Sequence, residues 1–322
     1  MEVRKLQLIG GSSYMVSLPK DWVRSNKLKQ GDELLLLIED DIVKIVPKKI
    51  SEDYRIVKAK ITNIPRYDEK FLERFVYALF IQGLDEVEIE DKGLTPRVIA
   101  KISSIVHSII GMEVIDASNG RVVLRSLTSS ELDVNGVLNR MAQIIEGIFD
   151  GIVDCMTLGD MEGLKDVKNL ENDTDRLYLL AIRLENRIMK DISSPSRWNE
   201  LRHILGMRLV AKFLEEIADD LHDFSEKLPE ISEEFKGNLL MFLEDLNSTF
   251  SKVMKAYISG DIDMAEDSIS QANEIEEILL KELEKGDANY RIAIYSLIDV
   301  SRNLKSIGEV AFNKAVRERY LS

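Results

Sequence analysis

Two pairs of acidic residues, each spaced four apart, are the residues of this sequence best suited to hold a metal ion. The pairs are Glu171-x-x-x-Asp175 and Glu215-x-x-x-Asp219, each in a segment with helical periodicity. Residues four apart share one helix face, where two like charges cost about 0.2–0.5 kcal/mol unless something neutralises them. Two such pairs facing each other would make an oxygen-rich site for Mg, Mn, Ca, Zn or ferric iron. The alternative is a solvated acidic face, the usual meaning of acid runs on helices.

The other polar residues give little support for an enzyme. Glu200-x-x-His203 matches part of the signature of di-iron carboxylate bundles, but that site needs the motif on two different helices. The similar spacing Asp219-x-x-His222 falls on the same predicted helix as the first, about five turns away. Three histidines, one cysteine and no glycine-rich phosphate loop leave little material for other catalysis. We therefore expect a protein without enzymatic activity.

The composition is that of a globular protein with several domains. At 322 residues and 45% hydrophobic content, the chain is long enough for two to three domains of about 100–150 residues each. The sequence has no apolar run of about 18 residues and no signal-peptide pattern at its N-terminus, which predicts a cytoplasmic protein without membrane insertion. The single cysteine, Cys155, excludes an internal disulfide and a cysteine metal cluster.

The net charge of −14 is unevenly distributed along the chain. Residues 1–50 carry a net charge of +2, residues 51–130 carry −1, and residues 131–322 carry −15. A strongly acidic surface repels the phosphate backbone of nucleic acids, whereas a mildly basic one tolerates it. If the protein binds DNA, the N-terminal segment is expected to do so.

Residues 1–50 are predicted to form four short strands and one short helix. Glycine-rich and Gly-Asp turns separate strands over Val3–Ile9, Tyr14–Leu18, Glu33–Ile38 and Ile42–Val46, with Asp21 expected to cap the helix and Glu39–Asp41 to form the last turn. About fifty residues with so few apolar side chains cannot bury an adequate core alone. The sequence therefore predicts that a second copy of the chain completes this unit.

The same residues resemble a known family. The run Arg4–Ser13, followed by SYMVSLPKDWV and LKQGDELLLLI, is similar to the swapped-hairpin DNA-binding domain of the AbrB/SpoVT/MazE family. The resemblance implies a β-barrel built by two interlocked chains, with basic residues facing DNA. The matching positions here are Arg4, Lys5, Lys20 and Arg24, with Ser12 and Ser13 as weaker candidates. Two alternatives stay open: these cations are ordinary solvated charges, or the hairpins only hold two chains together.

Residues 51–129 are predicted to form a small α/β domain in the order β-α-β-α-β-β. The strands are expected at Tyr54–Ile61, Leu84–Glu90, Met112–Asp116 and Arg121–Leu127, and the helices at Asp68–Gly83 and Thr95–Gly111. His107 lies among apolar neighbours, where a packed or partly exposed histidine is expected rather than a ligand. This segment shows no pattern typical of catalysis, and we expect a regulatory or linking domain.

Residues 130–322 are predicted to be almost entirely helical. Apolar residues at intervals of three and four end at Gly159-Asp160 and place Cys155 in the core of the first helix. Further helices are expected at Glu162–Asp191, Arg197–Leu228, Ser232–Ile258, Ile262–Lys285 and Ala288–Tyr320, with breaks that include Ser193–Pro195. The six helices fall into two sets of three, over about 130–229 and 230–322.

The two sets read as a repeat. ENDTDRLYLLAIRLENRI corresponds to ANEIEEILLKELEKG, and KFLEEIADDLHDF corresponds to RNLKSIGEVAFNK. This pattern resembles the PhoU family of phosphate-uptake regulators, whose two three-helix bundles carry repeated Glu/Asp-x-x-x-Asp metal motifs. With the hairpin domain in front, the whole chain resembles archaeal phosphate-uptake regulators of that group. The resemblance implies metal ligands at Glu171, Asp175, Glu215 and Asp219.

The second bundle departs from the metal motif. Ala272 and Glu276 stand where the first bundle has Glu171 and Asp175, and Lys305 and Glu309 stand where it has Glu215 and Asp219. Glu276 and Glu309 are therefore only weaker ligand candidates, and Lys305 could replace the missing cation by pairing with either.

The sequence thus predicts a non-enzymatic regulator of phosphate uptake that forms homodimers through its hairpins. In one interpretation the dimer is a transcriptional regulator that binds DNA while the metal-binding helical domain senses a state of the cell. In the other, the helical bundles dock onto a phosphate transporter's ATPase or a signalling kinase, and the hairpins only dimerise.

Overall fold

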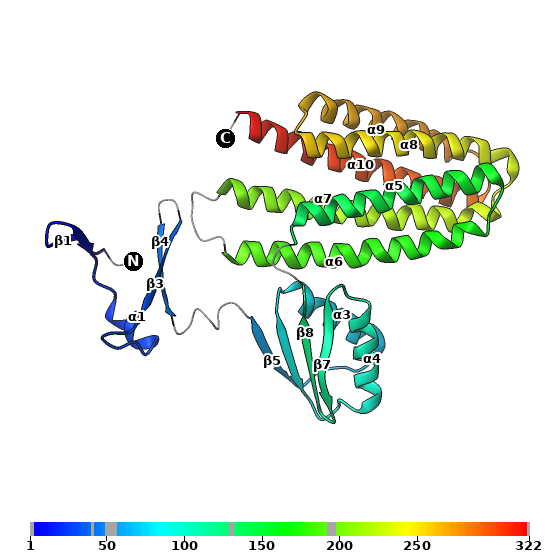
Figure 1. The fold of residues 1–322 in the computed structure, drawn as a ribbon. Helices are drawn as coiled ribbons and strands as arrows, with labels where there is room; N and C mark the ends of the chain where they lie inside the picture. Colours follow the sequence, from blue (N-terminus) through cyan, green and yellow to red (C-terminus); the bar gives the residue numbers. More distant parts are fainter. Residues whose placement is uncertain (1–2, 40–41, 49–56, 129–131, 192–197, 321–322) are drawn as a thin grey trace. The chain divides into compact units, whose positions relative to one another are not determined.

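The computed structural model describes residues 3–39, 42–48, 57–128, 132–191 and 198–320 (Figure 1). The described residues up to Val57 form one compact unit, and those from Lys58 onward form another. Several predicted features lie outside the described residues. They are the turn at Asp40-Asp41, the start of the strand at Tyr54, the domain limits at 50/51 and 129/130, and the helix break at Ser193–Pro195.

The first unit contains two β-hairpins and a short helix. Strand β1 (Gln7–Ile9) pairs antiparallel with β2 (Ser13–Met15), and β3 (Leu34–Glu39) pairs antiparallel with β4 (Ile42–Pro47). The first turn uses Gly10 and Gly11, both at positive φ, a conformation that costs glycine little. Helix α1 (Lys20–Ser25) lies between the hairpins in the sequence. The single chain thus forms separate two-stranded sheets, while the predicted barrel requires a second chain.

Two local predictions for this unit were wrong. The first two strands are shorter than expected, because residues 3–6 and 16–18 are not part of β1 or β2. The helix begins at Lys20 with Pro19 in the capping position, so Asp21 lies in the first helical turn and does not cap. The fixed φ of Pro19 suits a helix start, and a carboxylate in the first turn is favourable beside the helix N-terminus.

Many large apolar side chains of the hairpin unit are exposed, and the others are half-buried. Among the described residues 3–48, no Val, Leu, Ile, Met, Phe, Tyr or Trp is buried. The exposed ones are Val3, Leu6, Leu8, Ile9, Tyr14, Met15, Val16, Leu35, Leu36, Leu37, Ile38 and Val43. Contiguous apolar surface of this extent marks an interaction site on a folded protein.

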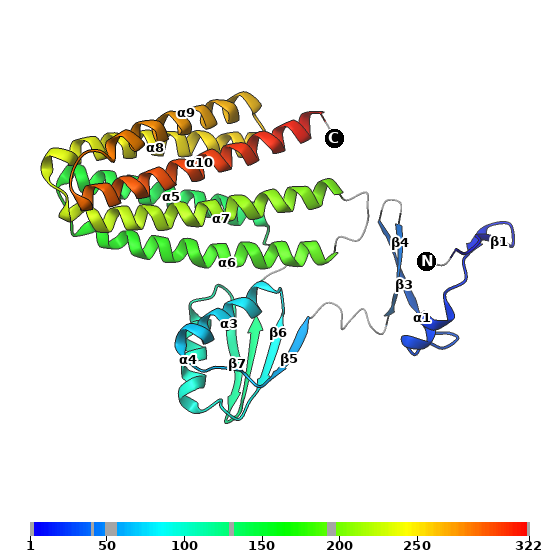
Figure 2. The same cartoon turned by 180° about the vertical axis from the view of Figure 1, so that it is seen from behind.

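The second unit begins with an α/β domain that has the predicted β-α-β-α-β-β order. Its sheet has the strand order β5-β6-β8-β7, in which β5 and β6 are parallel and the other neighbours antiparallel. Its elements are β5 (Lys58–Thr62), α3 (Glu69–Ile81), β6 (Glu86–Glu90), α4 (Pro96–His107), β7 (Met112–Ser118) and β8 (Arg121–Ser126). Both helices cover one face of the sheet (Figure 2). The side chains of Asp68 and Thr95 cap α3 and α4 by accepting backbone N–H bonds.

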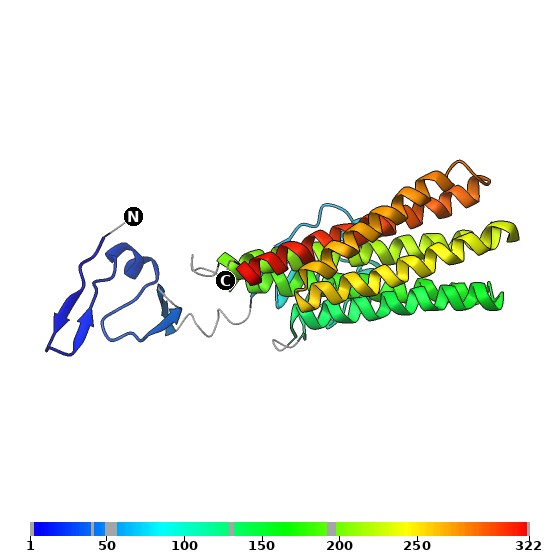
Figure 3. The same ribbon diagram turned by 90° about the horizontal axis from the view of Figure 1, so that it is seen from above.

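Six long helices follow. They are α5 (Val134–Leu158), α6 (Val167–Asp191), α7 (Trp198–Lys227), α8 (Glu233–Ser259), α9 (Ile262–Glu282) and α10 (Ala288–Tyr320). Helices α5, α6 and α7 contact one another, as do α8, α9 and α10, which confirms two three-helix bundles (Figure 3). The bundles pack together through α7 against α10 and α5 against α8.

Most helix ends lie close to the predicted stop signals, but α4 ends at His107 and not at Gly111, α9 ends at Glu282 and not at Lys285, and α6 starts later than expected. Helices α5 and α8 both end at a left-handed glycine, Gly159 and Gly260, a conformation that favours glycine. Helix α6 begins at Val167 and not at Glu162, because Gly163–Asp166 forms a separate 3-10 turn. A Cβ at Gly163 would lie 2.9 Å from the Cys155 sulfur, so this turn packs closely on α5.

The α/β domain is fixed to α6 by arginine side chains. The Arg183 guanidinium is fully buried and donates to the backbone oxygens of Phe80 (2.9 Å) and Leu84 (2.8 Å), at the end of α3. It also lies 3.4 Å from Asp85, which pairs with Arg187. Burial lowers the pKa of Arg183 to about 10, so the side chain stays charged at neutral pH. These bonds use carbonyl groups that a helix end leaves free.

Candidate functional site

Helices α6 and α7 bring three of the four predicted metal ligands together. One carboxylate oxygen from each of Glu171, Asp175 and Asp219 lies within 4.8 Å of the other two. Glu171 is buried, while the two aspartates are half-buried. Asp219 follows the buried stripe of α7, which includes Ile217 and Ala218, so the packing of that stripe on α6 directs Asp219 toward the first pair.

The electrostatics of this acidic cluster, defined as Glu171, Asp175 and Asp219, favour a bound cation or proton. Burial, followed by repulsion from Glu215, Asp175 and Glu171, raises the pKa of Asp219 to about 7. Burial, followed by repulsion from Glu171 and Glu215, raises the pKa of Asp175 to about 6. Carboxylates crowded in a half-buried site resist ionisation, so a metal ion that binds here would compete with a proton, chiefly at Asp219.

The all-carboxylate donor set fits a hard cation. Calcium, magnesium and manganese prefer oxygen ligands, whereas softer ions prefer sulfur or imidazole. Such an ion would neutralise the repulsion among the three carboxylates. Within the described part of the chain, no histidine or cysteine joins a comparable group.

Glu215, the fourth predicted ligand, is not part of the cluster. Lys212, three residues earlier on α7, forms an ion pair with it and lies 3.4 Å from Glu216. A second lysine, Lys168, lies 2.6 Å from the Glu171 carboxylate. The ion pairs of these two lysines with the acidic residues were not predicted from the sequence. Each lysine stands three residues before a predicted ligand, a spacing that places it on the same helix face.

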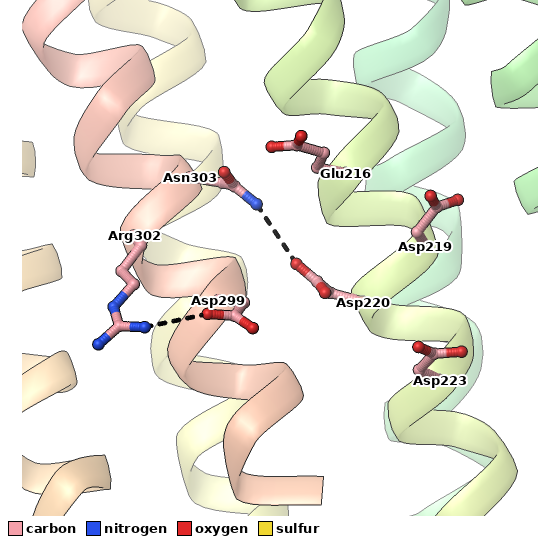
Figure 4. Close-up of a pocket in the computed structure, with 7 residues that line it drawn as sticks. All are labelled: Glu216, Asp219, Asp220, Asp223, Asp299, Arg302 and Asn303. Carbon is pink, nitrogen blue, oxygen red and sulfur yellow. Dashed lines mark hydrogen bonds and ion pairs between the residues drawn. The ribbon is translucent and has the colours of Figure 1, made fainter. Parts of the chain in front are cut away.

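An acidic cleft of about 450 Å³ adjoins the cluster between α7 and α10 (Figure 4). Its lining is Glu216, Asp219, Asp220, Asp223, Asp299, Arg302 and Asn303. Asp219 and Asp220 point in different directions from α7, and Asp220 accepts a hydrogen bond from Asn303 at 3.3 Å. Burial, then repulsion from Asp299, raises the pKa of Asp220 to about 8. The acidic surface of the helical region thus continues from the first bundle to the second.

The second bundle has different residues and contacts at the positions that correspond to the predicted metal ligands. Glu276 of α9 pairs with Arg302 of α10 (Nε to Oε1, 2.7 Å), so Arg302 takes the role that the sequence suggested for Lys305. Ala272 is buried, and its carbonyl accepts a bond from the Ser301 hydroxyl at 2.7 Å. Glu309 is exposed. Among the described residues, this bundle forms no group of three acids like that of the first.

The remaining polar candidates lie apart from the cluster. His203 is half-buried near Lys314 and Arg317 of α10, and burial lowers its pKa. His222 lies 3.8 Å from Glu226 of its own helix. Cys155 packs against the core, where burial and nearby aspartates raise the pKa of its thiol. His107 is exposed, with Nδ1 2.6 Å from the Ser103 carbonyl.

The cations predicted to face DNA all lie on exposed parts of the hairpin unit. Arg4 and Lys5 precede β1, Lys20 is the first residue of α1, and Arg24 lies on α1, 4.0 Å from Asp21. Ser12 lies in the turn before β2, and Ser13 is the first residue of that strand. All six residues are exposed.

Comparison with protein-family models finds two matching segments of the chain. Residues 7–53 match the family of antidote-toxin recognition MazE, bacterial antitoxin, and residues 138–228 match the PhoU domain. The acidic cluster lies within the PhoU-like segment, as do the two lysines beside it.

One solved structure is similar to the helical part. The crystal structure of PhoU from Pseudomonas aeruginosa matches 57% of this chain and 94% of its own, with 16% identity and a TM-score of 0.45. A search of curated proteins finds no match. None of the described helices combines the length and apolar character needed to cross a membrane.

Proposed function

We propose that this protein is a non-enzymatic, cytoplasmic regulator of phosphate uptake. Two copies pair through their hairpin units and bind DNA, while the PhoU domain binds a hard metal ion at the acidic cluster. The observation that carries the proposal is that one chain contains both a MazE-type segment and a PhoU-like segment. A segment that dimerises, joined to a regulatory domain, is the arrangement expected of a ligand-responsive regulator.

The exposed apolar side chains of the hairpin unit support pairing with a second copy. A unit without buried large apolar residues gains little free energy from folding alone, because apolar burial supplies most of the favourable term. Interlocking with an identical unit would bury residues such as Leu36 and Ile38 and supply the missing free energy of apolar burial. Pairing also doubles the number of exposed cations available to contact phosphates.

DNA binding is tested by a gel-shift titration with mixed-sequence duplex DNA over a range of salt concentrations. We expect binding by the wild type that weakens steeply with salt, and loss of binding in Arg4→Ala/Arg24→Ala, with the dimer intact by light scattering. The control Arg140→Ala/Lys281→Ala removes the same charge from exposed helical positions and should bind like the wild type.

A wild-type dimer that fails to shift DNA even at low salt would contradict the DNA-binding role. The hairpins would then serve assembly only, and the second function would apply, in which the helical bundles dock on a phosphate transporter's ATPase or a signalling kinase. The acidic cleft between α7 and α10 favours a basic partner surface for such docking.

Metal binding is tested by elemental analysis after dialysis against Mn²⁺ and removal of the free ion. The wild type should retain the metal, and Glu171→Gln/Asp219→Asn should lose it, because two of the three clustered carboxylates are gone. Glu276→Gln/Glu309→Gln makes the matched change in the second bundle and should retain wild-type content. Equal metal content in all three proteins would contradict the proposed site.

A further inference from the structure

The internal repeat places a cation at the same position in both bundles. In the corresponding segments KFLEEIADDLHDF and RNLKSIGEVAFNK, Lys212 and Arg302 are both the first residue. In the other pair of corresponding segments, ENDTDRLYLLAIRLENRI of α6 and ANEIEEILLKELEKG of α9, Asp175 corresponds to Glu276. The contacts of Arg302 therefore show what a cation at this position can reach in the same helical framework.

In the second bundle this cation is bound to the neighbouring helix. The Arg302 guanidinium extends from α10 to Glu276 of α9 at 2.7 Å, and its other end lies 3.2 Å from Asp299. Ala272 stands where the first bundle has the carboxylate of Glu171, so the Arg302 guanidinium has only the Glu276 carboxylate to neutralise between α9 and α10. In the second bundle the positive charge between the helices is thus supplied by a side chain of the protein itself.

In the first bundle the ion pairs of the cation are with carboxylates of its own helix, and its contact with α6 is with the Tyr178 ring. Lys212 pairs with Glu215, lies 3.4 Å from Glu216, and has its ammonium 5.5 Å from the Tyr178 ring. Its side chain is 41% exposed, so it can leave Glu215 without breaking core packing. A flexible four-carbon stem and a compact charge make lysine easier to displace than a paired arginine.

We propose that Lys212 is a tethered counter-cation of the acidic cluster that an incoming metal ion displaces, which frees Glu215 to become the fourth ligand. The inference rests on the proposed metal site and names how that site is regulated. Without metal, Lys212 lowers the repulsion among the carboxylates. With metal, two cations compete for the same carboxylates, so Lys212 sets the affinity. In the second bundle Arg302 neutralises Glu276, and Ala272 and Lys305 leave too few carboxylates for a metal ion.

Lys168 is a less complete candidate for this role. It pairs with Glu171, a member of the cluster, but the corresponding position in the second bundle is Ile269. It also does not hold the missing fourth carboxylate, whereas Lys212 does. The inference is therefore assigned to Lys212.

The test is a calorimetric titration of the full-length protein with Mn²⁺. Lys212→Met should bind Mn²⁺ about tenfold more tightly than the wild type, because a positive charge near the site is removed and Glu215 is released. Glu215→Gln should weaken binding. In the Glu215→Gln background, adding Lys212→Met should give a smaller gain than it gives in the wild type, because no fourth carboxylate remains to be released.

Lys285→Met is the matched control. Lys285 also pairs with a glutamate three residues away, Glu282, at 2.6 Å, but at the far end of α9. Its removal changes the net charge equally and should leave Mn²⁺ affinity within about twofold.

The outcomes separate the two proposals. If neither the wild type nor Lys212→Met binds Mn²⁺, the proposed metal site itself is wrong. If the wild type binds Mn²⁺ and Lys212→Met binds it equally or more weakly, the metal site stands and the tethered counter-cation is overturned. Circular dichroism of each variant establishes that the helices remain folded.

Discussion

In the first bundle three carboxylates from α6 and α7 lie within 4.8 Å of one another, whereas in the second the corresponding helices present one carboxylate already paired with a guanidinium. The backbone is the same in outline, since each bundle has three long helices and its first helix ends at a left-handed glycine. The difference lies in a few side chains. One framework therefore holds either a cluster of three carboxylates or an internal ion pair, depending on which residues project between its second and third helices.

The residues between the second and third helices also differ between the two bundles. In the second bundle, a Cβ at Gly308 would lie 2.8 Å from Ile269, and Ser301 bonds to the Ala272 backbone. Small residues let α9 and α10 approach closely. The residues of α7 that correspond to Ser301 and Gly308 are Ala211 and Ala218, which are also small and buried, whereas Ala272 corresponds to the buried Glu171. The two bundles therefore differ here in the polar atoms that Glu171 places between α6 and α7.

The largest expected effect concerns the contact between the first bundle and the α/β domain. Arg183→Met should lower the free energy of unfolding by about 3 kcal/mol, because it leaves buried carbonyl groups and Asp85 without their donor. Urea unfolding measures the change. The corresponding second-bundle position is the exposed Glu284, where Glu284→Met should be nearly neutral. If both substitutions lowered the free energy of unfolding equally, the buried arginine contact would not distinguish the first bundle from the second.

A smaller effect is expected from the charge of the acidic cluster. The pKa of Asp219 is raised in the folded protein, so its stabilising contribution is complete below about pH 4 and is lost as the pH rises through about 7. The groups that face it are Glu215, Asp175, Glu171 and Lys212. In the presence of a chelator, Asp219→Asn should therefore stabilise the protein at pH 8 by about 1 kcal/mol, after allowance for solvent screening, and change little at pH 4.

Thermal unfolding at the two pH values measures this effect. Glu309→Gln is the matched control, because it removes a carboxylate from the corresponding exposed position of the second bundle. If Asp219→Asn destabilises the metal-free protein at pH 8, the carboxylate is not repelled by its neighbours and the electrostatic account of the cluster fails.

The smallest effect is expected at the ion pair of the second bundle. Arg302→Met should cost less than about 1 kcal/mol, because Arg302 is half-exposed and pairs of this kind contribute little. It should also leave the second bundle unable to bind Mn²⁺, since Ala272 and Lys305 still occupy two ligand positions. Chemical denaturation and calorimetry check the two expectations, and a second equivalent of bound Mn²⁺ would show that Arg302 alone excludes the ion.

The sequence predicted the elements that depend on periodicity and local stop signals. Helix α10 has the expected limits of Ala288 and Tyr320, and the order of the α/β domain was correct. The four-residue spacing of the acids also identified Glu171, Asp175 and Asp219. These features depend on residues close together in the chain, whose geometry a helix fixes.

The errors concern contacts that spacing does not determine. Glu215 has the same spacing as the residues of the acidic cluster, but the direction of its carboxylate depends on Lys212, so its role as a ligand stays a prediction. The pairing of Arg302 with Glu276 depends on the rotation of α10 against α9, so the sequence suggested Lys305 instead. The bonds from Arg183 to Phe80 and Leu84 join residues about a hundred positions apart, and neither partner oxygen belongs to a distinctive side chain.

The exposed leucine and isoleucine side chains of β3 have a consequence for how the protein melts. If their cover is supplied by another molecule, the order of the hairpin unit depends on protein concentration, whereas the helices bury one continuous core within the chain. Dilution would then unfold the hairpins while the bundles remain intact. Two transitions would be seen, and only the first would move with concentration. Contact with DNA would in that case respond to the amount of protein in the cell as well as to the state of the acidic cluster.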